Sequence, residues 1–141
     1  MPTFRPDGER LLTLETNESL FYQYSWPDAK LVAKQRDFNE TDDDEAIPGY
    51  YIVYLKSGLV VVQSANSRLY LFDPAKMERL TELVIEGFAP VPINEAFPGL
   101  KDKALYSPIG SFERFGDILV ATTGRHVKNQ AMLLFSEDDL I

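Results

Sequence analysis

The chain has 141 residues, of which 45% are hydrophobic and 26% are charged, and its formal net charge is −8. This length suits one domain, residues 1–141, with a core of its own, and the composition excludes an intrinsically disordered chain. Because there is no cysteine and only one histidine, the sequence excludes disulfides, thiolate zinc sites, a thiol nucleophile and a three-histidine zinc site.

The acidic charge is concentrated toward the N-terminus. Residues 1–50 carry 11 acidic and 5 basic side chains, whereas residues 51–141 carry 11 and 9. Such a field favours solubility, attracts basic proteins and repels nucleic acid and anionic lipid, so we expect neither of the last two as a partner. The N-terminus lacks an apolar signal segment, and no apolar run can span a bilayer. We therefore expect a cytoplasmic protein.

The first predicted elements are two strands joined by a polar turn. An apolar run at residues 11–14 precedes "ETNES", and "LFYQY" at residues 20–24 leads into "SWPD". The next segment, 27–37, is rich in helix formers and is compatible with a helix or a third strand. Beyond it, "NETDDDEAIPG" has adjacent acids instead of the alternating ligands and central glycine of a calcium loop. This stretch is expected to be a solvated loop that can serve as an acidic docking patch.

The middle of the chain repeats this order. Strands are predicted at Leu59–Val62 and Leu69–Phe72, with the turn cluster "SANS" between them. Segment 74–86 then has two interpretations. Asp73 and Pro74 can cap and begin a helix that Gly87 ends, or they can form a type I turn that leads into an outermost strand. Both interpretations remain open at the level of sequence.

The last predicted hairpin has a longer connection. Ile118–Ala121 precedes "TTGRHVKNQ", and "AMLLF" follows. The single histidine, His126, lies in this basic connection. Catalysis would require a nucleophile or carboxylate partner that the spacing does not indicate, so we interpret His126 as an exposed turn residue.

An internal repeat links these elements. "EAIPG" at Glu45–Gly49 returns as "EAFPG" at Glu95–Gly99, an offset of 50 residues, and Gly8 is followed by Gly58 at the same offset. Several ordered matches at one period predict tandem units, which we place at 1–49, 50–99 and 100–141. Each unit contains two apolar runs of strand length separated by a polar turn.

The units resemble blades of β-propeller repeats of the WD or kelch type. The resemblance rests on "FRPDGERLLTLETNESLFYQYSWPDAKLVAK" and "YLKSGLVVVQSANSRLYLFDPAKMERLTEL", in which an aromatic residue precedes a Pro-Asp or Asp-Pro turn. It implies a mainly β fold of tandem antiparallel repeats, with the alternative of an α+β fold whose helices occupy 27–37 and 74–86. Rings of this kind use about four to eight blades, so three units imply self-association, such as a homodimer with six units, or a compact β-sheet assembly that only imitates blades.

The expected function is non-catalytic binding. The glycines are scattered, and neither a phosphate loop nor a nucleophile elbow is present, so we expect no catalytic residue, no metal and no cofactor. We expect an acidic protein-interaction module. The alternatives are an immunity- or antitoxin-type neutraliser of a basic toxin, and a β-repeat protein that binds carbohydrate or another small ligand. Exposed aromatic and acidic side chains suit recognition, and the predicted protein-binding residues are Tyr22, Tyr24, Trp26, Asp42, Asp43, Asp44 and Glu45.

Overall fold

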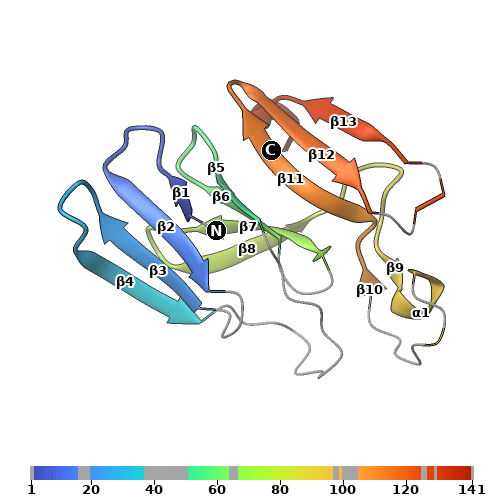
Figure 1. The fold of residues 1–141 in the computed structure, drawn as a ribbon, viewed down its shortest axis with the longest axis horizontal. Helices are drawn as coiled ribbons and strands as arrows, with labels where there is room; N and C mark the ends of the chain where they lie inside the picture. The colour runs from blue at the N-terminus through green and yellow to red at the C-terminus, as the bar shows by residue number, and fades with distance from the viewer. Residues whose placement is uncertain are drawn as a thin grey trace.

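The computed structural model describes residues 2–15, 20–36, 51–63, 67–96, 99, 105–124, 127–128 and 130–140. In these ranges the chain is mainly β, with four antiparallel sheets. Three of them are larger and lie side by side as a fan, from the first sheet at the left of Figure 1 to the third at the right. The mainly β prediction is therefore confirmed.

The first and second sheets each have four strands in chain order. The first sheet contains β1 (Pro2–Phe4), β2 (Arg10–Glu15), β3 (Leu20–Ser25) and β4 (Leu31–Arg36). The second sheet contains β5 (Ile52–Tyr54), β6 (Val60–Gln63), β7 (Leu69–Asp73) and β8 (Glu78–Leu83).

The third sheet has three strands, β11 (Ile109–Phe115), β12 (Ile118–Thr123) and β13 (Met132–Phe135). Between it and the second sheet lie β9 (Val91–Pro92), the four-residue helix α1 (Ile93–Ala96) and β10 (Leu105–Tyr106). A short 3-10 helix, η2 (Glu137–Leu140), follows β13. The predicted unit boundaries at 49/50 and 99/100 involve residues outside the described ranges, so those boundaries stay a prediction.

The helical interpretation of 74–86 is wrong. Pro74–Met77 form a hairpin loop in which the Asp73 carboxylate accepts a hydrogen bond from the Ala75 amide at 2.9 Å, and Met77 has a φ of 51°. The chain then pairs with β7 as strand β8, at the edge of the second sheet. The helix proposed for 27–37 is wrong in the same way, because β4 pairs with β3. In both places pairing to an available strand edge overrides helix propensity.

The first strands of the three sheets lie next to one another. β5 contacts both β1 and β11, and the Tyr54 amide donates to the Thr3 hydroxyl across 3.1 Å. Gly8 and Gly58, which the repeat places 50 residues apart, are at the hairpin turns that follow β1 and β5. Their φ angles of 76° and 92° are left-handed, which is a backbone conformation that glycine adopts without steric cost.

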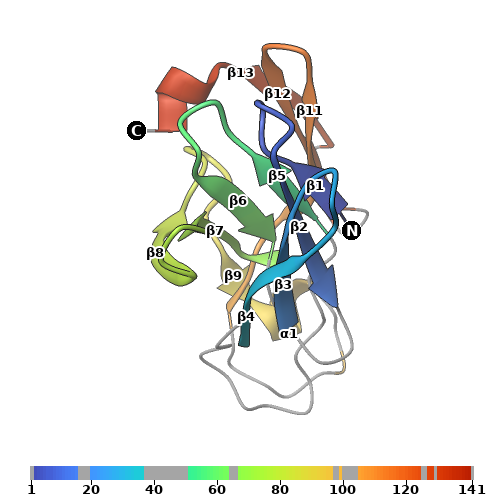
Figure 2. The same cartoon turned by 90° about the vertical axis from the view of Figure 1, so that its left-hand side faces the viewer.

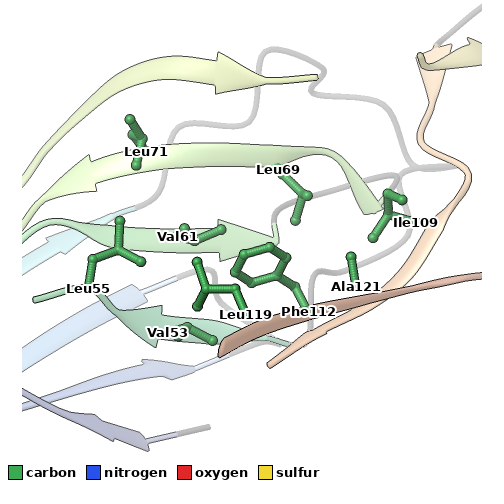
Figure 3. Packing of buried hydrophobic residues seen from close by; sticks show 9 residues of the cluster. All are labelled: Val53, Leu55, Val61, Leu69, Leu71, Ile109, Phe112, Leu119 and Ala121. Atoms are coloured by element: carbon green, nitrogen blue, oxygen red, sulfur yellow. The ribbon is translucent and has the colours of Figure 1, made fainter. Parts of the chain in front are cut away.

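Two hydrophobic clusters hold the fan together. One contains buried residues of the first and second sheets: Leu12, Leu14, Phe21, Ile52, Tyr54, Val60, Val62 and Phe72. The other joins the second and third sheets: Val53, Leu55, Val61, Leu69, Leu71, Ile109, Phe112, Leu119 and Ala121. Figure 3 shows Phe112 of the third sheet among Val61, Leu69 and Leu119. The second sheet is thus covered on both faces, and each fully buried aliphatic or aromatic side chain stabilises the fold by about 1.5–3 kcal/mol.

Candidate protein-binding surface

The outer face of the first sheet carries an aromatic group. Because strand residues alternate between faces, Leu12 and Phe21 point toward the second sheet, and Tyr22 and Tyr24 point away from it. Figure 2 looks onto the molecule from the side of this sheet. Tyr22 and Tyr24 lie with ring centroids 6.5 Å apart, and the Lys34 ammonium lies 5.9 Å from the centre of the Tyr22 ring.

Trp26 extends this group at the end of β3. Its ring meets Phe4 of β1 edge to face, with centroids 5.3 Å apart, and both side chains are exposed. The structure therefore brings together three of the predicted binding residues, Tyr22, Tyr24 and Trp26. The acids at 42–45 lie outside the described residues, as does His126. Phe4 was missed as a partner of Trp26, because only the pairing of β1 with β2 brings the two strand ends together.

The outer face of the third sheet is a second apolar surface. Its most exposed side chains come from all three strands. They are Phe115 (61% exposed), Ile118 (49%), Met132 (68%) and Leu134 (63%). Phe115 is paired with Ile118, and Leu134 is paired with the half-buried Val120. In the sequence, part of this surface corresponds to the apolar runs "ILVA" and "MLLF". Such runs are equally typical of strands that are buried on both faces, so they do not predict an exposed face.

The interface between the second and third sheets is closed at one end by a half-buried carboxylate. Glu137 of η2 accepts hydrogen bonds from the amides of Lys56 at 2.8 Å and Ser57 at 3.0 Å, and from Arg114 at 3.0 Å. Burial raises the pKa of Glu137, but these donors outweigh it and bring the pKa below its ordinary value. Lys56 also pairs with Asp117 in the neighbouring turn. These bonds tie the end of the described chain to two sheets.

The interface between the first and second sheets instead contains a cleft of about 510 Å³. Arg10, Gln23 and Tyr54 line it, together with the turns of both sheets. Arg5 also lines it and pairs with Asp7 at 2.7 Å, and the hydrogen bond from Arg5 lowers the pKa of Asp7.

The polar groups of this cleft include a buried phenol. The Tyr54 hydroxyl has no hydrogen-bond partner of ordinary geometry among the described residues. Burial raises its pKa, and the nearby Gln23 amide and the two arginines partly oppose that rise. A phenol, an amide and a guanidinium can bind a small polar ligand, but they do not form a nucleophile with a general base.

Within the described ranges, no group of three or more His, Asp or Glu side chains is placed to hold a metal ion. No helix in those ranges is long and apolar enough to cross a membrane.

Comparison with known proteins supports a propeller-type fold. No protein-family model and no curated protein matches the chain. Among solved structures, the WD40 repeats of RRP9 match 96% of this chain with a TM-score of 0.54 and 10% identity. Hydrazine synthase of Kuenenia stuttgartiensis matches 98% of this chain with a TM-score of 0.56 and 11% identity. Glutaminyl cyclase of Myxococcus xanthus matches 85% of this chain with a TM-score of 0.52 and 16% identity.

These likenesses concern the fold alone. The chain spans 34–41% of the length of these three structures. The likenesses support a generic propeller-type arrangement of the sheets, as the resemblance inferred from the sequence implied. A narrower family is not indicated.

Proposed function

We propose that this chain is a non-catalytic protein-interaction module that binds through the outer faces of its first and third sheets. The observation that carries this proposal is the third sheet, which leaves Phe115, Met132 and Leu134 in solvent on a face with little charge. Contiguous apolar surface of this kind marks an interaction site. The aromatic group with Trp26 supports the proposal at the opposite end of the fan, since Tyr and Trp provide large contact area with few torsions to order.

The charge of the chain adds to this proposal. A net charge of −8 speeds the encounter with a basic protein and disfavours acidic competitors. An immunity- or antitoxin-type neutraliser of a basic toxin is a sharper form of the same idea, in which Asp42, Asp43, Asp44 and Glu45 contribute the charge. A second copy of this chain, giving a homodimer, is also a protein partner that would cover the apolar faces.

A capture experiment with matched variants tests the module. Wild-type protein, Leu134→Asp and the control Leu80→Asp, which alters an exposed leucine of edge strand β8, are used as bait at low salt. We expect wild type and Leu80→Asp to retain the same partner, and Leu134→Asp to lose it. A partner retained equally by all three baits would place binding elsewhere, and a high-salt wash that leaves a partner bound would argue against a charge-driven encounter.

The cleft between the first and second sheets favours a second candidate function, the binding of a carbohydrate or another small polar ligand. Its volume of about 510 Å³ falls within the range of small-molecule sites, and Arg10, Gln23 and Tyr54 provide donors inside it. A glycan array and a metabolite thermal-shift screen on wild type, Tyr54→Phe and Trp26→Ala separate the sites. A hit lost only in Tyr54→Phe assigns the cleft, one lost only in Trp26→Ala assigns the outer aromatic face, and no hit removes this candidate.

A further inference from the structure

The hairpin registers place the three sheets in a common frame. In each sheet the first hairpin closes on one residue pair: Arg5 with Arg10, Leu55 with Leu59, and Phe115 with Ile118. Two residues beyond the closing pair, the second strand has Leu12, Val61 and Val120 at equivalent positions. On the third strand of the three sheets, the residues paired with these positions are Gln23, Leu71 and Leu134, respectively. The third-strand residues one pair further along on the same face are Phe21, Leu69 and Met132.

Equivalent positions differ sharply in exposure. Leu71 of the second sheet is 7% exposed, because the third sheet covers it, whereas its counterpart Leu134 is 63% exposed. Leu69 is 2% exposed, and its counterpart Met132 is 68% exposed. The third sheet therefore presents apolar side chains at the positions that the first and second sheets use to bind the sheet that follows them.

The first sheet presents the complementary face. Counted in the same register, Tyr24 is the counterpart of Phe72, and Tyr22 is the counterpart of Tyr70. Phe72 and Tyr70 are buried in the second sheet, and Phe72 stacks on Phe21 of the first sheet with ring centroids 4.4 Å apart. In the first sheet the equivalent aromatic side chains face away from the fan.

We infer that the outer face of the third sheet packs on the outer face of the first sheet in a second copy of this chain. This inference rests on the proposed function and names the partner. The contact between the two copies has a counterpart of the internal Phe21–Phe72 stack. Met132 of one copy takes the place of Phe21, and Tyr24 of the other copy takes the place of Phe72. Contacts between a methionine sulfur and an aromatic ring are favourable and tolerant of geometry.

Ring size selects the number of copies. Propeller rings contain about four to eight blades, and the described residues of one chain form the three sheets of the fan, so two copies give a ring in that range. The contact is head-to-tail, and in a closed pair it occurs twice by two-fold symmetry. Both apolar faces of both copies are then covered.

Charge favours the same occupant. The chain as a whole is acidic and repels its copies, but these two faces carry little charge, and that charge has opposite sign. Among the described side chains, Glu113 lies on the outer face of the third sheet, and Lys34 lies on that of the first sheet above Tyr22. Among the described side chains of the two faces, a purely basic partner would meet Glu113 as the acid.

Cross-linking tests the predicted contact directly, because the chain has no cysteine of its own. Met132→Cys and Tyr24→Cys are made singly and together, and are treated with a short bis-maleimide at micromolar protein concentration. The closed pair predicts a covalent dimer from the double variant and from a mixture of the two single variants, and little product from either single variant alone. Lys76→Cys, on an exposed hairpin loop, is the control for random collision.

The outcomes separate the closed ring from its alternatives. A ladder of higher multimers would show an open filament, and yields equal to those of Lys76→Cys would show no specific contact; either result overturns the inference. Light scattering should give twice the chain mass for wild type and Leu80→Asp, and the mass of a single chain for Leu134→Asp. Circular dichroism confirms that each variant is folded. A wild-type monomer overturns the ring, and the proposed function survives that result only if a different partner is captured in a Leu134-dependent way.

Discussion

The second sheet and the third sheet have similar strands but different surroundings. In the second sheet, Val61 and Leu71 are covered by the third sheet and Val60 and Phe72 by the first, so both faces are buried. In the third sheet, Phe112 and Leu119 are buried, but the opposite face is open. Strand hydrophobicity is therefore a property of the repeat, whereas the burial of a strand face depends on whether another sheet packs against it.

The largest expected effect comes from the interface that both sheets share. Phe112→Ala empties the centre of the cluster shown in Figure 3 and should lower the free energy of unfolding by about 3–5 kcal/mol. Urea unfolding monitored by circular dichroism measures it. A loss below about 1 kcal/mol would mean that the second and third sheets do not unfold as one unit.

Leu71 and Leu134 form a matched pair, because they are the same residue type at equivalent register positions. Leu71→Ala should cost about 2–5 kcal/mol, and Leu134→Ala in the isolated chain should stay within about 0.5 kcal/mol. Unfolding is measured at two protein concentrations. If the ring forms, the loss caused by Leu134→Ala becomes larger under conditions in which wild type is dimeric, since the leucine is then buried.

Glu137→Gln tests the closed end of the same interface. The carboxylate accepts three hydrogen bonds, one of them from Arg114, so its loss at pH 7 should cost about 1–3 kcal/mol.

The pH dependence of this effect has a defined sign. Because the folded-state pKa of Glu137 is lowered, its contribution is present above the ordinary value of 4.5 and is lost as pH falls through the folded pKa. Thermal melts from pH 7 to pH 3 should therefore show the wild-type and Gln curves converging. A constant difference across this range would contradict the lowered pKa.

The smallest effect is expected on the open face of the first sheet. Phe4→Leu removes the edge-to-face contact with Trp26 and should cost about 0.5–1.5 kcal/mol. The chain has one tryptophan, so its fluorescence reports on this face alone. Emission that does not change on substitution would indicate that the two rings do not pack in solution.

Much of the strand pattern could be predicted from the sequence. The expected runs 69–72 and 118–121 match β7 and β12 closely, and the pair Gly8 and Gly58, which the repeat matches, lies in equivalent turns. Segment 74–86 could not be settled, because Ala75–Leu80 have good helix propensity and the competing strand edge of β7 exists only in the folded sheet. The two-stranded sheet of β9 and β10 and the helix α1 are too short to leave a periodic signal.

The candidate surface was predictable only in part. Tyr22, Tyr24 and Trp26 were singled out for their residue type, and the structure places them on one face. The apolar face with Met132 and Leu134 was not predicted, because an apolar run in the sequence does not indicate whether one face or both faces of its strand are buried.

The sequence by itself determined the 50-residue offset between the first two units, the strand-forming runs and the absence of thiol chemistry, since these depend on local residue type and spacing. Only the tertiary structure decided that 78–83 is an edge strand and that the outer faces of the first and third sheets are open. The physical reason is that side-chain alternation gives every strand two faces, and the burial of each face is decided by which sheet packs against it.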